Sequence, residues 1–386
     1  MRICIAYDCL FPWTVGGAER WYRNLAERLA ADGHEVTYLT RLQWGIGDEP
    51  HLPGIKVIAV SRADDLYGPD GNRLIGPPLR FGRGVLKHLR RHGTDYDVVH
   101  MASFPYFSVL AAALARRRGG YRLVIDWHEV WSREYWRAYL GPVGGRVGYA
   151  VQRRCVRVRH TAFCFSRLFQ ARLREEGLRE EATVLEGEYA GSLEPPTPRE
   201  ADPLVVFAGR HIPEKRAPAV VAAIGKARAR GLDIRGLIFG DGPERPAVLE
   251  AITAHGLQDV VEAPGFVAGD VVDDAIGRAL CLLHPSSREG YGLVVVEASA
   301  HGTPAVVVDG PDNAAVELVE DGVNGVVARS ADADDLADAL LAVSEAGLGL
   351  RERTCGWFAA NAERLSLARS LDVVAGAYAG APESHV

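Results

Sequence analysis

The most constraining feature of this sequence is a regular alternation of short apolar runs with amphipathic segments, which begins at the first residues. A strand-like run at residues 2–7 is followed by Trp21, Leu25 and Leu29 at helical spacing and then by a second strand-like run at residues 35–40. Later strands of the same series are predicted at residues 56–60, 97–101, 122–127, 161–165 and 183–185. Alternation of this kind is typical of a parallel sheet covered by helices.

A proline-rich stretch interrupts the alternation. Residues 191–200 contain three prolines and show no apolar periodicity, as in interdomain linkers. A second series follows, with predicted strands at residues 204–208, 236–239, 279–283 and 304–308 and predicted helices at residues 217–230, 243–255 and 332–344. The sequence therefore predicts two doubly wound, Rossmann-like α/β domains, residues 1–190 and 203–356, joined by a linker at residues 191–202 and facing each other across a ligand-binding cleft.

The two predicted domains differ in charge. Residues 1–190 contain 28 Lys and Arg against 21 Asp and Glu, whereas residues 191–386 contain 16 against 29. Opposite signs favour different partners for the two halves, and we expect no nucleic acid among them. Only four of the 44 basic residues are lysines, which adds weight to a lysine found inside a motif.

The sequence also indicates where the protein acts. Residues 1–7 lack the apolar core of a signal peptide, and no stretch reaches the roughly eighteen apolar residues of a membrane span. We expect a cytoplasmic protein, with peripheral contact at the inner membrane face as an alternative. The six cysteines show no Cys-x-x-Cys spacing, so we interpret them as buried thiols and predict neither a metal site nor disulfides.

The stretch Arg-Glu-Gly-Tyr-Gly-Leu-Val-Val-Val-Glu, which ends at Glu297, joins a predicted strand to a predicted helix. Its turn leaves the backbone N–H groups of Tyr291, Gly292 and Leu293 at a helix N-terminus, which favours an anion such as a phosphate. Glu289 and Glu297 lie eight positions apart and can flank a ligand about 10 Å long, which is the size of a nucleotide sugar. Two solvated surface glutamates are the alternative interpretation.

Two motifs of the first domain lie at strand ends. Gly16 and Gly17 precede the first helix and allow close backbone approach to a ligand, although a tight turn alone would explain them. His128 follows a predicted strand and can donate to a sugar hydroxyl or a phosphate, although it can equally be a core histidine packed by Trp127 and Trp131. The sequence patterns of dinucleotide-binding enzymes, P-loop ATPases and His-Glu-x-x-His zinc enzymes are absent.

The second domain offers cations and further turns. Arg210 and Lys215 follow its first strand and are suited to holding a diphosphate that must leave with its charge neutralised, with a solvated basic pair as the alternative. Two more turns at strand ends are predicted to accept a nucleobase, and they contain Gly240, Gly242, Phe266 and Val267.

These motifs occur together in a fixed order. They are Gly-Gly-Ala-Glu after the first strand, Gly-Arg-x-x-x-x-Lys after the linker, Gly-Asp-Gly-Pro, Glu-Gly-Tyr-Gly-Leu within a Glu-x7-Glu spacing, and Glu-Leu-Val-Glu-Asp-Gly-Val-Asn-Gly from Glu317. The set resembles the GT-B-fold retaining glycosyltransferases of family GT4 and covers nearly the whole chain. The resemblance implies an enzyme that moves a hexose from a UDP- or GDP-sugar with retained anomeric configuration, without a cofactor or a metal.

The resemblance also implies roles for individual residues. The donor diphosphate would be held by two cations and by backbone groups, namely Arg210, Lys215, Gly16, Gly17, Tyr291, Gly292 and Leu293. Glu289 would bind hydroxyls of the donor sugar, Glu297 those of the ribose, and His128 would contact the sugar near its reacting carbon. Residues 357–386 would form a helix that crosses back to the first domain.

The acceptor is left open by the sequence. Aromatic residues cluster after His128 and suit a sugar ring or a flat natural product, namely Trp127, Trp131, Tyr135, Trp136 and Tyr139. A predicted helix nearby places Arg153, Arg154 and Arg157 on one face, as in helices that touch anionic lipid, so a lipid-linked acceptor is the alternative. We expect a soluble saccharide or natural-product acceptor first. A GT-B-fold sugar-nucleotide epimerase and a noncatalytic nucleotide-sugar-binding protein remain as other hypotheses.

Overall fold

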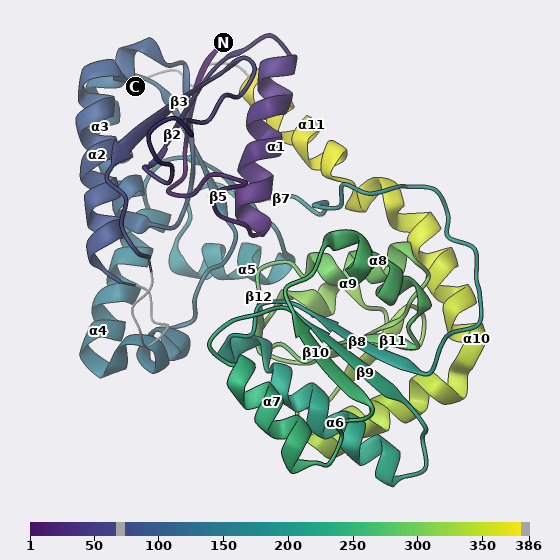
Figure 1. The fold of residues 1–386 in the computed structure, drawn as a ribbon. Helices are drawn as coiled ribbons and strands as arrows, with labels where there is room; N and C mark the ends of the chain where they lie inside the picture. Colours follow the sequence, from purple (N-terminus) through teal and green to yellow (C-terminus); the bar gives the residue numbers. More distant parts are fainter. Residues whose placement is uncertain (67–73, 380–386) are drawn as a thin grey trace. The chain divides into compact units, whose positions relative to one another are not determined.

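The computed structural model describes residues 1–66 and 74–379. Contacts divide the chain into two units. Unit 1 consists of Met1–Glu186 and the segment that begins at Ser370, and unit 2 is Gly187–Arg369. Each unit contains a parallel sheet with helices packed on it (Figure 1). The predicted pair of doubly wound α/β domains is therefore confirmed.

The described part of unit 1 has a seven-stranded parallel sheet in the order β3-β2-β1-β4-β5-β6-β7. Its strands are β1 (Arg2–Ala6), β2 (Glu35–Arg41), β3 (Ile55–Ser61), β4 (Val98–Ala102), β5 (Arg122–Trp127), β6 (Thr161–Cys164) and β7 (Thr183–Val184). Its helices are α1 (Gly17–Ala31), α2 (Gly76–His92), α3 (Tyr106–Gly119), α4 (Arg133–Val156), α5 (Arg167–Glu176) and α11 (Leu367–Ala379), most of which belongs to this unit, with the short 3-10 helix η1 (Gly93–Asp95). The strand order reverses between β1 and β4, where ligands bind in doubly wound sheets.

The described part of unit 2 repeats this design with a six-stranded parallel sheet in the order β10-β9-β8-β11-β13-β15. Its strands are β8 (Leu204–Ala208), β9 (Arg235–Phe239), β10 (Val261–Gly265), β11 (Cys281–His284), β13 (Ala305–Val308) and β15 (Gly325–Ala328), with β12 (Arg288–Glu289) and β14 (Asp312–Asn313) paired separately. Its helices are α6 (Ala217–Ala229), α7 (Arg245–Ala254), α8 (Gly269–Arg278), α9 (Leu293–Ala300) and α10 (Ala333–Leu365), with the 3-10 turns η2 (Pro213–Lys215) and η3 (Ala314–Leu318). Figure 1 shows α6 and α7 on one face of this sheet and α8 and α9 on the other.

Burial explains why the second sheet forms where the sequence predicts it. Val205 and Phe207 of β8 pack in one core with Val220 and Ile224 of α6, and all four side chains are fully buried. Each such side chain contributes about 1.5–3 kcal/mol relative to an exposed one. The predicted bounds of β5 and β8 agree with the structure, and all six cysteines are buried free thiols, as predicted.

The last predicted helix differs from the structure. Helix α10 begins far earlier than residue 357 and passes through a kink at Gly347, whose φ is 50°. It ends before Ser366, which is extended and whose Oγ accepts a hydrogen bond from the Arg369 backbone N–H at 3.2 Å. This N-cap starts α11 as a separate helix. Residues 380–386 of the predicted helix lie outside the described part of the chain.

Candidate active site

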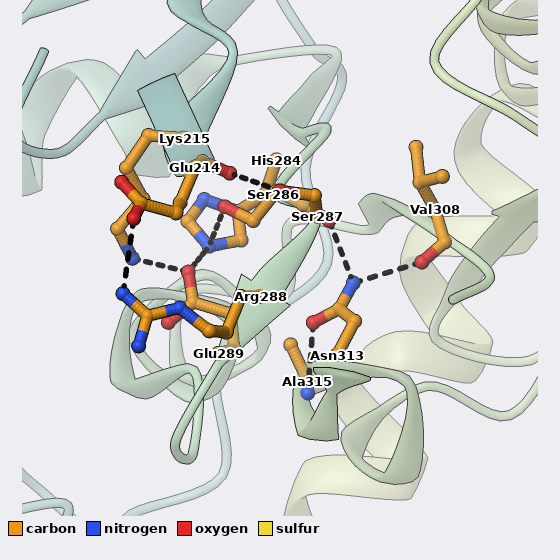
Figure 2. A network of polar contacts seen from close by, with 10 residues as sticks. All are labelled: Glu214, Lys215, His284, Ser286, Ser287, Arg288, Glu289, Val308, Asn313 and Ala315. Carbon is orange, nitrogen blue, oxygen red and sulfur yellow. Dashed lines mark hydrogen bonds and ion pairs between the residues drawn. The ribbon is translucent and has the colours of Figure 1, made fainter. Parts of the chain in front are cut away.

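The loop after β11 carries the glutamate-rich stretch to the carboxyl edge of the unit 2 sheet. Strands β12 and β14 pair in parallel, so that Glu289 lies opposite Asn313. The buried Asn313 amide donates to the carbonyls of Ser286 at 3.1 Å and Val308 at 2.8 Å, and its oxygen accepts from the Ala315 N–H at 3.2 Å (Figure 2). These bonds fix the loop to the end of β13.

Glu289 is held by donors from two different loops. Its Oε1 accepts from Lys215 Nζ, in the turn after β8, and from His284 Nε2, at the end of β11 (Figure 2). Glu289 is only 7% exposed, and burial alone raises its pKa. The Lys215 charge and the contact with His284 outweigh burial and hold the pKa of Glu289 well below its usual range. Glu289 is therefore ionised at neutral pH.

The loops after β8 and β11 are joined directly. The Glu214 carbonyl accepts from the Ser287 N–H at 2.8 Å, and the Arg288 guanidinium pairs with the Glu214 carboxylate at 3.2 Å. Arg210 lies in the same β8 loop as Lys215, and it is exposed. Within residues 1–66 and 74–379 its guanidinium makes no hydrogen bond or ion pair, so the loop after β8 carries a second cation that is available to a ligand.

The Gly-Asp-Gly-Pro turn packs on the loop after β8. Gly240 has a φ of 119°, and a Cβ there would lie 1.9 Å from the Gly209 carbonyl oxygen, so only glycine fits. Gly242, with a φ of 149°, approaches the His211 carbonyl in the same way. The His211 N–H donates to the Asp241 carbonyl at 2.8 Å. The turn after β9 and the turn after β8 thus form one connected surface.

The other predicted nucleobase residues follow β10, the neighbour of β9. Phe266 is 78% exposed, and Val267 is partly buried. The Gly240 N–H donates to the Gly265 carbonyl at 2.9 Å, which links the two turns. The structure therefore brings Gly240, Gly242, Phe266 and Val267 to one edge of the sheet.

Helix α9 begins beside the same loop. Its N-cap, Gly292, has a φ of 105°, and a Cβ there would lie 2.6 Å from the Ala315 Cβ. Tyr291 is buried next to it, and Leu293 is the first helical residue. Because glycine has no side chain to cap the helix, the first-turn amides suit an anionic ligand. Glu297 lies one turn further along α9 and is partly buried.

The remaining donor-site candidates lie in unit 1. Gly16 is the N-cap of α1, and Gly17 is its first residue. The His128 ring follows β5 and stacks on Phe165 at 4.3 Å between ring centroids. Burial lowers the pKa of His128 to about 4, and the charge of Asp126 offsets this only in part, so the ring is neutral at pH 7. Its Nε2 is buried and has no hydrogen-bond partner in the described part of the chain.

The aromatic cluster after His128 is organised by a buried amide. Gln152 Oε1 accepts from the Tyr106 hydroxyl at 2.8 Å, Trp136 Nε1 at 2.9 Å and the Trp131 N–H at 3.2 Å. Gln152 Nε2 donates to the Trp131 carbonyl at 2.9 Å and to Glu176 Oε1 at 2.7 Å. One side chain of α4 therefore ties the cluster to the end of α5.

Burial separates the members of this cluster. The Trp127 and Trp136 rings are buried in unit 1, and Trp127 Nε1 contacts His160 Nε2 at 3.1 Å. The rings that reach the surface are those of Trp131, Tyr135 and Tyr139. The predicted contact of Trp127 and Trp136 with an acceptor therefore does not agree with this structure, because both rings are buried inside unit 1.

The three arginines predicted to share one helix face, the last of which is the C-cap that follows α4, do not share one exposed face. Arg154 and Arg157 are exposed, whereas Arg153 is partly buried, with its guanidinium 5.9 Å from the Tyr149 ring centroid. The exposed face of α4 also carries apolar residues, since Val143 is 73% exposed and Val147 is 59% exposed. In residues 1–66 and 74–379 no helix has both the length and the apolar character to cross a membrane.

Two family models match the chain. One, described as Glycosyltransferase Family 4, matches residues 15–186, and the other, described as Glycosyl transferases group 1, matches residues 193–354. A D-inositol 3-phosphate glycosyltransferase of Xylanimonas cellulosilytica is 30% identical over 91% of this chain and 91% of its own. The chain belongs to the family 4 glycosyltransferases.

Two further similarities bear on this glycosyltransferase. An alpha-D-kanosaminyltransferase of Streptomyces kanamyceticus is 33% identical over 138 residues, and the match spans about a third of that relative, 35% of its length and 36% of this chain. The structure of Anabaena HepE in complex with UDP and glucose superposes with a TM-score of 0.73 at 19% identity, and the match covers 99% of this chain and 100% of HepE. The latter similarity shows the fold, which is GT-B.

Four polar residues of this glycosyltransferase were missed by the sequence analysis. His284 and Asn313 hold Glu289 and its loop, and Asp126 and His100 form a buried pair in unit 1 with 2.7 Å between Asp126 Oδ1 and His100 Nε2. The sequence feature that could have identified His284 is its position at the end of an apolar run, just before the motif that contains Glu289. No three His, Cys, Asp or Glu side chains gather as metal ligands within residues 1–66 and 74–379.

Proposed function

We propose that this glycosyltransferase moves a hexose from a nucleotide-diphospho-sugar, a UDP- or GDP-sugar, to a hydroxyl group of a small saccharide or natural product. One observation carries the proposal: the buried, ionised Glu289 lies with Lys215 at one sheet edge, and Arg210 lies in the same loop as Lys215. A carboxylate accepts hydrogen bonds from sugar hydroxyls, and cations neutralise a leaving diphosphate. HepE has this fold and is bound to UDP and glucose, which supports UDP-glucose as the first donor to test.

The other residues take supporting roles in the proposal. Lys215 and Arg210 hold the diphosphate together with the amides at the start of α9, Glu297 binds the ribose, and the turns after β9 and β10 receive the base. Transfer retains the anomeric configuration. The bond from the anomeric carbon to the phosphate oxygen breaks, the acceptor oxygen bonds to the same face, and its proton passes to the leaving phosphate. No metal takes part, and no protein base is assigned.

The acceptor is proposed to be a small polar molecule on the unit 1 side. The partly exposed rings of Trp131, Tyr135 and Tyr139 suit a sugar ring, and one relative is named for D-inositol 3-phosphate. A lipid-linked acceptor is the second candidate, because Val143 and Val147 are exposed on a helix that also presents Arg154. Co-sedimentation with anionic vesicles would favour the lipid, and its absence would favour the soluble acceptor.

The test begins with thermal shift on a panel of nucleotide sugars in the presence of a chelator. Each hit is then mixed with candidate acceptors, products are detected by mass, and the anomeric configuration is read by proton NMR. A new sugar product from donor alone would indicate an epimerase instead. A shift without any turnover would indicate a noncatalytic binding protein, and inversion of the anomeric carbon would contradict retention.

Two substitutions separate the roles of the carboxylate and the cation. Glu289→Gln removes the charge that faces the sugar, so kcat should fall roughly 10²-fold or more while UDP affinity stays within about threefold. Lys215→Ala removes a phosphate contact and should weaken UDP binding about tenfold or more.

Matched controls come from the same unit. Glu250→Gln alters an exposed glutamate of α7, and Lys226→Ala alters a lysine of α6 that pairs with Asp334 at 3.3 Å. Both should leave kcat and UDP affinity unchanged. Equal losses of kcat and of UDP affinity in both site variants would contradict the division of roles.

A further inference from the structure

Among residues 1–66 and 74–379, Glu289 makes hydrogen bonds through one of its two carboxylate oxygens. Both Lys215 Nζ and His284 Nε2 donate to Oε1 (Figure 2). Among the described residues, Oε2 has no hydrogen-bond partner. Two donors on one oxygen set the orientation of the carboxylate and leave the other oxygen for a ligand.

The two donors differ in how firmly they are placed. Lys215 has a long side chain that is 18% exposed, in a turn followed by Arg216 at a φ of 51°. His284 is 1% exposed at the end of a central strand, and its ring stacks near Phe207 at 6.3 Å between centroids. A diphosphate would attract Lys215 away from Glu289, whereas His284 has no room to leave.

The hydrogen bonds of His284 indicate which ring nitrogen carries the proton that faces Glu289. Because Nε2 donates to the Glu289 carboxylate, the proton is on Nε2. Nδ1 is buried without a partner in the described part of the chain, so a second proton there would lack an acceptor. The Nε2–H group is therefore the donor that His284 offers to Glu289. Ser286 Oγ also lies within hydrogen-bonding distance of the same nitrogen, at 3.2 Å, which is longer than the contact with the carboxylate.

We propose that His284 is a positioning residue for sugar transfer: its Nε2–H keeps hold of Glu289 Oε1 when Lys215 turns to the diphosphate, and so reserves Oε2 for a hydroxyl of the donor sugar. This inference rests on the proposed function, because it assigns the sugar to Glu289. It predicts that kcat depends on where the side chain of residue 284 places its donor nitrogen, and not only on the volume of that side chain.

Two amide substitutions test this directly. The side-chain nitrogen of His284→Gln can reach the position of Nε2, whereas that of His284→Asn stops near the position of Nδ1. His284→Asn should lower kcat roughly tenfold to a hundredfold, the loss expected from one hydrogen bond to a charged group. His284→Gln should stay within about threefold of the wild type. The KM for the donor should change little in both, because Lys215 still holds the phosphate.

The pH profile gives a readout that a packing defect would not change. Loss of a donor to Glu289 makes the carboxylate easier to protonate, so the acidic limb of the kcat profile should move to higher pH in His284→Asn and stay in place in His284→Gln. A double variant, His284→Asn with Glu289→Gln, should be no slower than Glu289→Gln alone, since His284 acts through Glu289.

The outcomes separate this inference from the proposed function. Equal kcat values for the Asn and Gln variants, or an additive double variant, would overturn the positioning role. If His284→Asn fails to fold, as read by its melting temperature, the Gln variant and its double with Glu289→Gln carry the test by the same criteria. If Glu289→Gln itself transfers sugar at the wild-type rate, the proposed site is wrong. If Glu289→Gln loses transfer while His284→Asn keeps the wild-type rate, the proposed function stands and this inference fails.

Discussion

Glu176 is a buried carboxyl group whose ionisation the fold disfavours. It is 6% exposed, its Oε1 accepts from Gln152, and burial raises its pKa to about 7, against the opposing charges of Arg153 and Arg172. The pKa of Glu176 is therefore higher in the folded protein than in the unfolded chain, where it is about 4.3. The free energy of unfolding has its full value below the unfolded pKa and decreases as the pH rises to about 7. The cost at pH 8 is roughly 3–4 kcal/mol.

Replacing this carboxyl with an amide should remove that pH dependence. Glu176→Gln keeps an oxygen for Gln152 and cannot ionise, so its melting temperature relative to the wild type should rise between pH 5 and pH 8. Thermal unfolding at a series of pH values measures this. Glu175→Gln, next to it and exposed, is the control. A constant difference across the pH range would mean that Glu176 ionises freely in the folded protein.

At the same scale, the sequence predicted Glu289 and its partner Lys215 but neither His284 nor Asn313. Glu289 belongs to a local motif with a fixed spacing, so a single stretch of sequence identifies it. His284 and Asn313 gain their roles from contacts that form only when β11, β12 and β14 come together. Burial also assigned Trp127 and Trp136 to the core, which an aromatic cluster in a sequence does not reveal.

At the scale of elements, the turn after β9 depends on glycine for two reasons. Gly240 has a positive φ and would place a Cβ 1.9 Å from the Gly209 oxygen, whereas Gly231 has a φ of 94° with open space around it. Gly240→Ala should therefore destabilise unit 2 by more than about 2 kcal/mol, and Gly231→Ala by only about 1 kcal/mol. Urea unfolding measures both, and equal costs would show that steric overlap at Gly240 is relieved.

The predicted bounds of an element were correct where the local sequence alone determines its structure. The strands β5 and β8 are continuous apolar runs between turns, and their bounds were predicted as they occur. No strand was predicted at β10, and only its last two residues were placed in a predicted turn, because Pro264 and Glu262 hide a strand that forms by pairing with β9. The two-residue strands β12 and β14 have no sequence signal at all, because each is defined by the other.

At the scale of the whole molecule, α11 completes unit 1. The Tyr378 hydroxyl donates to His100 Nδ1, His100 Nε2 donates to Asp126, and Trp21 Nε1 donates to Asp126 Oδ2 at 2.8 Å. All four side chains are buried. Burial alone raises the pKa of Asp126, but His100 outweighs it and lowers that pKa. The network joins residues far apart in the sequence.

Removing the Tyr378 hydroxyl should affect one unit only. Tyr378→Phe leaves the buried His100 Nδ1 without a donor and should cost unit 1 about 1–3 kcal/mol. Hydrogen exchange should increase in β4, β5 and α11 and stay unchanged in β8 and β11 of unit 2. Tyr149→Phe, on the partly exposed part of α4, is the control. Faster exchange throughout both units would contradict this local assignment.

The division of the chain also sets an order of events during synthesis. Unit 2 is one continuous segment, whereas unit 1 needs the residues from Ser370 onward, which leave the ribosome after all of unit 2. Domains usually complete in the order in which they are translated. Here the second unit has all its residues first, and a nascent chain that has reached only α10 still holds His100 and Asp126 without Tyr378 to cover them.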